Sequence, residues 1–207
     1  MILETNDLII RPSEWDDLED FCRWEQRPEV TEFFSISDGQ TMEDVVRKYV
    51  ADEADPKAQQ LTILLKEDRL QERGRGNQPI EIEGQMIENC DGIMKSAGTR
   101  KIGRIVLADI EEGWKGEIWR IYIGDKTLRG KGYGRQAMEA MMGYCFDVLG
   151  LERLYLDHYT GNPAAGLYLS LGFKYEGVLR KNCRKNGILY DVHLMSMLRE
   201  EYEALFG

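Results

Sequence analysis

Hydrophobic residues along the 207-residue chain recur with two different periods, and the order of these periods predicts a mixed α/β protein. Alternating β-branched and aromatic residues predict strands, while apolar residues spaced three or four apart predict amphipathic helices. We expect strands at residues 1–11, 60–66, 101–110, 117–123 and 153–159, and helices at residues 13–28, 41–55 and 136–149.

Residues with strong terminal preferences mark where several elements begin and end. Ser13-Glu14-Trp15-Asp16 and Thr41-Met42-Glu43-Asp44 both have the spacing of a capping box. Farther along, Asn162 is typical of an N-cap and Pro163 of the first helical position, which predicts a short helix there. Asn186-Gly187 lies between two alternating apolar runs and predicts a hairpin, so we expect the sheet to end in antiparallel strands.

The length of the chain allows one sizeable core, so we expect one domain spanning residues 1–207. Residues 67–100 are polar, contain glycines and exceed an ordinary connection of about four to six residues. We interpret them as an insertion. The alternating segment Ile80-Glu81-Ile82-Glu83 predicts a short strand within it.

Composition and charge narrow the function classes. A net charge of -10 argues against a nucleic-acid partner, which needs an extended basic surface, and favours a cationic substrate. No apolar run approaches the ~18 residues of a membrane helix, so we expect no membrane partner and a cytoplasmic protein. The scattered cysteines and two histidines leave little material for a metal site. We therefore expect no metal, reduced thiols and a buried Cys145.

The segment Arg129-Gly130-Lys131-Gly132-Tyr133-Gly134 lies where the strand at 117–123 gives way to the helix at 136–149. Glycines let backbone N–H groups approach an anion, and the following helix adds its free N–H groups and the positive end of its dipole. Lys126 and Arg135 add positive charge nearby. The spacing differs from a Walker loop and from the G-x-G-x-x-G of dinucleotide folds. The segment therefore predicts a pyrophosphate cradle, or alternatively a tight glycine turn that binds no ligand.

Two motifs in this order resemble the GNAT superfamily of acetyl-CoA-dependent N-acetyltransferases. The family's phosphate loop, [QR]-x-x-G-x-[GA], is matched completely at residues 129–134. Its later pattern, an asparagine followed by L-Y-x-x-x-G-F, is matched at Asn162 and at residues 167–173. Segments 8–12, 176–180 and 198–202 also resemble the Rim-type subgroup.

The resemblance implies a mostly antiparallel sheet in which one parallel pair, the strands at 117–123 and 153–159, splays apart to admit acetyl-CoA. It also implies that main-chain groups at 121–123 pair with the pantetheine arm. Asn162 would contact the cofactor, cap its helix, or do both. The implied cofactor-binding residues are Ile121, Tyr122, Ile123, Arg129, Gly130, Lys131, Gly132, Tyr133, Gly134, Arg135 and Asn162.

Amide formation from a thioester needs a neutral amine. An alkylammonium has a pKa near 10.4, so a base must remove its proton. Related chains carry a glutamate at the position of Glu117, which the resemblance makes the general base; the alternative is a solvated glutamate at a strand end. Tyr168 occupies the family position of an acid that protonates the departing thiolate, and its alternative is a buried tyrosine with a satisfied hydroxyl.

The sequence thus predicts direct transfer of acetyl to a primary amine, on a protein N-terminus, a polyamine or another small amine. A catalytically silent acyl-CoA-binding or partner-binding module on the same fold is the alternative. We expect residues 67–100 either to border the amine-binding side of the cleft and set substrate choice, or to form a surface flap or a homodimer contact.

Overall fold

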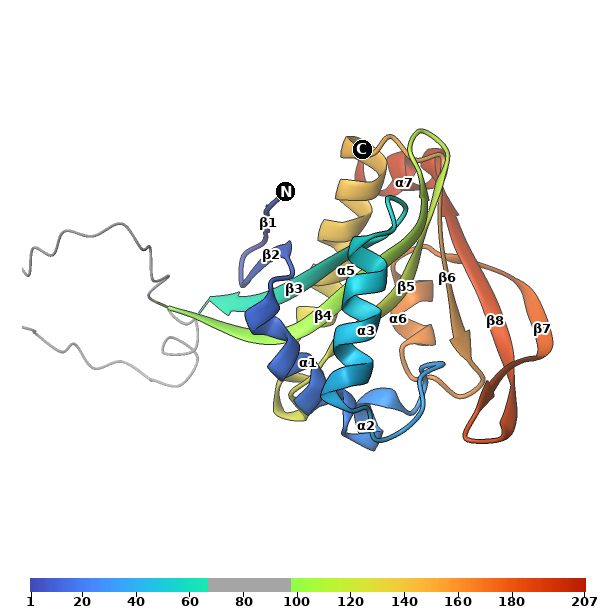
Figure 1. The fold of residues 1–207 in the computed structure, drawn as a ribbon. Coiled ribbons are helices and arrows are strands. Elements are labelled where there is room, and N and C mark those ends of the chain that lie inside the picture. The colour runs from blue at the N-terminus through green and yellow to red at the C-terminus, as the bar shows by residue number, and fades with distance from the viewer. Residues whose placement is uncertain (67–97) are drawn as a thin grey trace, which may run out of the picture.

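The computed structural model describes residues 1–66 and 98–207, which form an eight-stranded sheet with helices on both faces (Figure 1). The strands are β1 (Leu3–Glu4), β2 (Leu8–Pro12), β3 (Gln59–Lys66), β4 (Thr99–Glu111), β5 (Lys115–Ile123), β6 (Arg153–Tyr159), β7 (Lys174–Lys185) and β8 (Ile188–Leu198). The helices are α1 (Leu18–Glu25), α2 (Pro28–Thr31), α3 (Met42–Glu53), α5 (Tyr133–Gly143), α6 (Ala165–Ser170) and α7 (Arg199–Phe206). Shorter turns are the 3₁₀ segments η1 (Trp15–Asp17) and η2 (Lys126–Leu128) and the π-helical segment η3 (Tyr144–Val148).

The strand order is β1-β2-β3-β4-β5-β6-β8-β7, and the neighbouring strands are antiparallel except for β5 and β6. Parallel pairing between β5 and β6 begins at Lys115 with Arg153 and ends at Glu117 with Tyr155. Beyond that point the two strands diverge, while α5 and η3 supply the crossover that parallel strands require. The expected mostly antiparallel sheet with one splayed parallel pair is confirmed.

Different helices cover the two faces of the sheet. In Figure 1, α1 and α3 lie in front of the sheet and α5 lies behind it. On the α5 side, Met138, Met141 and Met142 are fully buried against the strands. On the other side, Phe21 and Trp24 of α1 form a separate buried cluster with residues of α3 and with Tyr122 of β5. Strand β5 therefore lies between two packed layers, and each of its faces has a different set of neighbours.

Two local contacts change the predicted N-terminal elements. The single strand expected at residues 1–11 is divided into β1 and β2, because a turn forms in which the Thr5 N–H donates to Leu8 O at 2.9 Å. The first capping box lies one residue later than predicted. Ser13 Oγ bonds Thr62 Oγ1 at 3.0 Å, so the Glu14 N–H instead donates to Asp17 Oδ2 at 2.8 Å.

Later boundaries show both agreement and correction. The Thr41 cap is confirmed, since its Oγ1 accepts from the Asp44 N–H at 3.2 Å. The helix expected at 136–149 begins earlier, at Tyr133, and becomes π-helical from Tyr144 onward. The hairpin at 186–187 is confirmed between β7 and β8, with φ of 49° and 81° in its two turn residues.

The insertion and the single-domain organisation stay predictions. Residues 67–97, which include the expected strand at 80–83, lie outside the described part of the chain. Within the described ranges, no helix is long and apolar enough to cross a membrane.

Candidate active site

A β-bulge lies on β5 next to the point where β5 and β6 separate. Val106 of β4 pairs with Arg120 and Leu107 pairs with Ile118, so Trp119 is the extra residue. Bulges bend a strand and change the direction of its side chains, and they are common beside active sites. Here Ile118 packs into the core shared with α5, whereas Arg120 hydrogen-bonds Glu25 of α1. The bulge therefore turns nearby side chains of one strand toward opposite faces.

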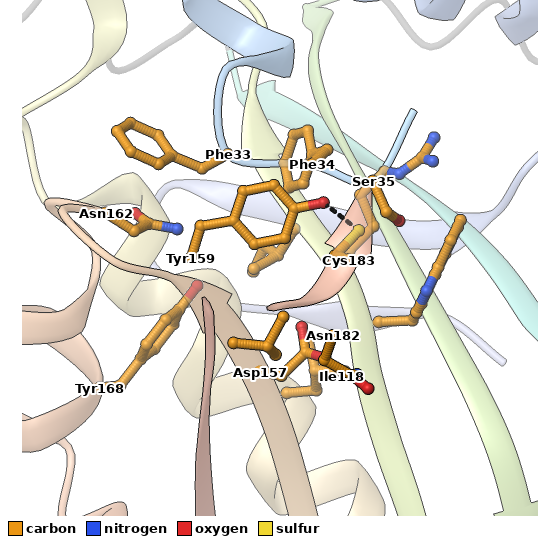
Figure 2. Close-up of a pocket in the computed structure, with 14 residues that line it drawn as sticks. Phe33, Phe34, Ser35, Ile118, Asp157, Tyr159, Asn162, Tyr168, Asn182 and Cys183 are labelled. Carbon is orange, nitrogen blue, oxygen red and sulfur yellow. Dashed lines mark hydrogen bonds between the residues drawn. The ribbon is translucent and has the colours of Figure 1, made fainter. Parts of the chain in front are cut away.

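A pocket of about 130 Å³ opens at this divergence. Strand β5 and its diverging neighbour β6 supply part of the wall, and the segment after α2, the start of α6 and strands β7 and β8 supply the rest. Figure 2 shows Phe33 and Phe34 on one side of the pocket and Tyr168 and Asp157 on the other. The lining residues are Phe33, Phe34, Ser35, Ile118, Trp119, Arg120, Ile121, Asp157, Tyr159, Asn162, Tyr168, Asn182, Cys183 and Val192.

The predicted cradle lies at the N-terminus of α5, an 11-residue helix. Gly132 is its N-cap with φ of 89°, and Gly130 has φ of 73°, both in the left-handed region that favours glycine. A Cβ added at either position would meet nothing within 4 Å, so backbone conformation and not crowding requires glycine there. The open N-terminus, with the exposed Lys131 within the loop, fits a pyrophosphate group.

Two of the predicted cationic ligands are engaged elsewhere. The Arg129 guanidinium donates to Ile123 O at 3.1 Å and to Glu29 O at 3.0 Å, which ties the glycine loop to β5 and α2. Arg135 bonds Glu139 at 3.3 Å and also Ser170 of α6. In these rotamers both arginines hold the loop in place. Neither guanidinium points only toward the cradle.

The main-chain segment 121–123 has one edge that pairs with none of the described strands, although the Ile123 carbonyl accepts from Arg129 Nε, and its binding of pantetheine stays a prediction. On one side it pairs with residues 103–105 of β4, and its other side faces away from β4 along the divergence, where no β6 pairing is formed. The side chains of this segment have structural contacts of their own. The Tyr122 hydroxyl donates to Glu25 Oε1 at 2.9 Å, and Ile123 lies in the core. Tyr133, at the start of α5, is likewise buried.

Glu117 occupies the last paired position of β5 and is half-buried. Burial raises the pKa of its carboxyl to about 7, and the negative charges of Asp157 and Asp109 add to the shift while Lys115 opposes it. Its pKa thus suits a base working near neutral pH. The side chain is not among those that line the pocket, which is a difference from the expected position of the base.

Tyr168 and Asn162 both line the pocket. Tyr168 is 7% exposed, and burial, together with the charge of Asp157, raises the pKa of its phenol to about 12. Its hydroxyl makes no hydrogen bond to any described residue, so the expectation of a satisfied buried tyrosine fails within that part of the chain. Asn162 Oδ1 accepts from the Ala164 N–H at 2.9 Å and holds a turn, which delays the helix from the predicted Pro163 to Ala165.

Sequence reasoning missed several pocket residues. Asp157 comes from β6, and Cys183 comes from β7 with its Sγ 2.6 Å from the Tyr159 hydroxyl. Arg120 belongs to a buried cluster in which Glu25 Oε1 accepts from Arg104 at 2.8 Å, Arg120 at 2.8 Å and Tyr122 at 2.9 Å. The alternation of residues 153–159 was the available signal for Asp157, since it puts Asp157 on the same face as Tyr155. Cys145, by contrast, is 1% exposed as expected, and burial raises the pKa of its thiol to about 12.

Comparison with known proteins identifies the family. Residues 7–174 match a family described as the acetyltransferase (GNAT) domain, which is more than half of the chain. The chain belongs to this family. It is an acetyl-CoA-dependent N-acetyltransferase.

Individual relatives agree with this assignment. The acetyltransferase is 26% identical over 204 residues to the uncharacterized N-acetyltransferase p20 of Bacillus licheniformis, covering 97% of each chain. It is 31% identical over 111 residues, 53% of this chain and 64% of the relative, to a spermidine N(1)-acetyltransferase of Vibrio cholerae. A crystal structure of spermidine N-acetyltransferase from Vibrio cholerae in complex with CoA and spermine has a TM-score of 0.73 and 21% identity, covering 96% of this chain and 99% of that chain. The Rim-type subgroup stays a prediction.

Proposed function

We propose that this acetyltransferase transfers acetyl directly to a primary amine, without a covalent enzyme intermediate, in the pocket at the divergence of β5 and β6. One observation carries the proposal: parallel pairing ends at Glu117 and Tyr155, and the pocket that opens beyond this point is lined by Tyr168, whose hydroxyl has no hydrogen-bond partner among the described residues. When bound, acetyl-CoA would supply the acyl group as an activated thioester.

The chain's own residues have separable roles in this proposal. The edge of β5 at 121–123, which pairs with no described strand and of which the Ile123 carbonyl is held by Arg129, would hold the pantetheine arm by its main-chain groups. The α5 N-terminus with Gly130, Gly132 and Lys131 would bind the pyrophosphate. The carboxylate system that contains Glu117 would remove the proton of the ammonium. Tyr168 would donate its proton to the departing sulfur.

The acceptor remains one of three classes: a protein N-terminus, a polyamine or another small amine. Two of the relatives above are named for spermidine, so polyamines belong in any first panel. The carboxylate of Asp157, which lines the pocket, supports a cationic acceptor, since an ammonium is attracted to it before it loses its proton.

A screen of acceptors tests the proposal. Purified protein with acetyl-CoA is offered spermidine, spermine, short peptides with free N-termini and small amines, and thiol release is followed against a control without amine. We expect at least one class to give turnover together with an N-acetylated product of the expected mass. If no amine is acetylated while coenzyme A binds normally by calorimetry, the proposal fails and the binding-module alternative is favoured.

A further inference from the structure

Asp157 lies on β6 at the position where this strand leaves β5. Glu117 and Tyr155 are register partners in the last paired row, so Asp157, two residues beyond Tyr155, is the next β6 residue on the same face, toward the opening. Its side chain is exposed and lines the pocket, whereas that of Glu117 does not. Of these two carboxylates, Asp157 is the one that an acceptor in the pocket would meet.

A second observation shows that this side of the pocket is built for a ligand. Tyr168 is only 7% exposed and lines the same pocket. Its hydroxyl has no hydrogen-bond partner among residues 1–66 and 98–207. The Asp157 carboxylate likewise accepts no hydrogen bond from a residue in these ranges. A hydroxyl on a buried tyrosine and a carboxylate that line one cavity without protein partners are typical of groups that interact with a bound molecule.

Asp157 is electrostatically coupled to both predicted catalytic residues. Its negative charge raises the pKa of Glu117 and the pKa of Tyr168, in each case as the second cause after burial. Asp157 is open to the pocket but has lost part of its water shell to the surrounding protein; this partial desolvation raises its pKa, and His158 opposes the rise. The other titratable and charged groups around Asp157 and Glu117 come from β4 (Asp109), β5 (Lys115 and Arg120), β6 (Tyr155, His158 and Tyr159), α6 (Tyr168) and β7 (Cys183).

We propose that Asp157 is the residue that takes the proton from the acceptor's ammonium, and that Glu117, which does not line the pocket, lies behind it without contacting the acceptor. This inference rests on the proposed function and names the residue that performs its first step. The expected general base, Glu117, thereby becomes the second member of a carboxylate pair.

The acceptor nitrogen loses two protons during acetyl transfer. One N–H bond of the ammonium breaks and its proton passes to an Asp157 oxygen, from which it leaves to water through the open side of the pocket. The neutral amine then forms the new C–N bond as the C–S bond breaks. Tyr168 gives its proton to the sulfur and is restored by the second proton lost from nitrogen. The sum is one amide, one thiol and one proton released to solvent.

Matched substitutions distinguish the role of Asp157 from the role of Glu117. We expect Asp157→Asn to lower kcat at least 100-fold while coenzyme A affinity stays within twofold. Glu117→Gln should lower kcat less than tenfold and leave the acid limb of the pH profile in place, because burial and not the charge of Glu117 raises the pKa of Asp157. Glu112→Gln, which removes a carboxylate from the exposed β4–β5 turn, controls for net charge and should change neither quantity.

The opposite pattern overturns the inference. If Glu117→Gln abolishes turnover while Asp157→Asn keeps most of it with its acid limb moved to lower pH, Glu117 is the proton acceptor. A wild-type protein that acetylates no amine is a separate result, which contradicts the proposed function itself.

A measurement on the wild-type protein does not depend on the folding of any variant. With ¹³C-labelled aspartate and glutamate side chains and coenzyme A bound, addition of the acceptor amine should shift the carboxyl resonance of Asp157 more than that of Glu117. A shift confined to Glu117 would contradict direct contact between Asp157 and the amine.

Discussion

At the scale of single residues, burial sets the chemistry of the site by changing proton affinities. The same enclosure raises the pKa of Tyr168 to about 12 and that of Glu117 to about 7. Both groups therefore stay protonated to higher pH than their ordinary values allow. A phenol that keeps its proton can serve as an acid, and a carboxyl that titrates near neutrality can exchange protons during turnover.

Tyr168→Phe tests the acid. Removing the hydroxyl should lower kcat roughly 10²-fold, the lower end for general acid catalysis, and leave coenzyme A affinity unchanged because the phosphate and main-chain contacts lie elsewhere. Steady-state kinetics and calorimetry measure both. Tyr175→Phe is the matched control, because Tyr175 is 52% exposed and lies outside the pocket. An unchanged kcat for Tyr168→Phe would assign the tyrosine to packing alone.

Glu117→Gln should also change the stability of the protein in a pH-dependent way. The unfolded carboxyl ionises near its ordinary pKa of 4.5, whereas the folded one ionises near 7, so the folded state binds more protons between these values. Wild-type stability therefore falls across this window. The amide avoids the loss, and we expect Glu117→Gln to be more stable than wild type by about 1–3 kcal/mol at pH 8, and equal to it at pH 4. Denaturant unfolding at both pH values checks this; a constant difference would contradict it.

At the scale of elements, features fixed by nearby residues could be predicted from the sequence, and features fixed by sheet pairing could not. The turn at 186–187 and the cap at Thr41 depend on local backbone preferences and agree with expectation. The bulge at Trp119 depends on the register between β4 and β5, which no local pattern reports. For Asp157, the alternation of residues 153–159 indicates which face of β6 it lies on, but its place in the pocket follows from where β5 and β6 stop pairing.

The glycine loop gives an element-scale prediction. Gly132→Val should weaken coenzyme A binding strongly, because a φ of 89° is costly for a β-branched residue and the altered loop would misdirect the first N–H groups of α5. Gly143→Ala is the control: it lies at the opposite end of α5, its Cβ would lie 3.6 Å from the Tyr202 hydroxyl, an ordinary contact, and alanine favours a helix. We expect its affinity within twofold of wild type by calorimetry. Equal affinity in both variants would contradict the cradle.

At the scale of the whole molecule, the strands that flank the insertion are already paired. Lys66 of β3 and Thr99 of β4 are register partners, so a short turn can connect them without disturbing the sheet. Replacing residues 68–98 with a short Gly/Ser link should therefore leave coenzyme A affinity intact. If the insertion sets substrate choice, the KM for the amine will change. A folded variant with an unaltered amine profile would leave the surface-flap or dimer-contact alternative.

If acetyl-CoA binds at the divergence of β5 and β6 as proposed, its concentration also sets how stable the protein is in a cell. A ligand held at the edge of β5 at 121–123 binds the folded chain and not the unfolded one, so it stabilises the fold by RT ln(1 + [L]/Kd). The free energy of unfolding of the protein then depends on how much acetyl-CoA and coenzyme A a cell contains. In a cell depleted of both, a larger fraction of the chains is unfolded at any moment and open to proteolysis, so scarcity of the donor lowers the amount of the enzyme that consumes it.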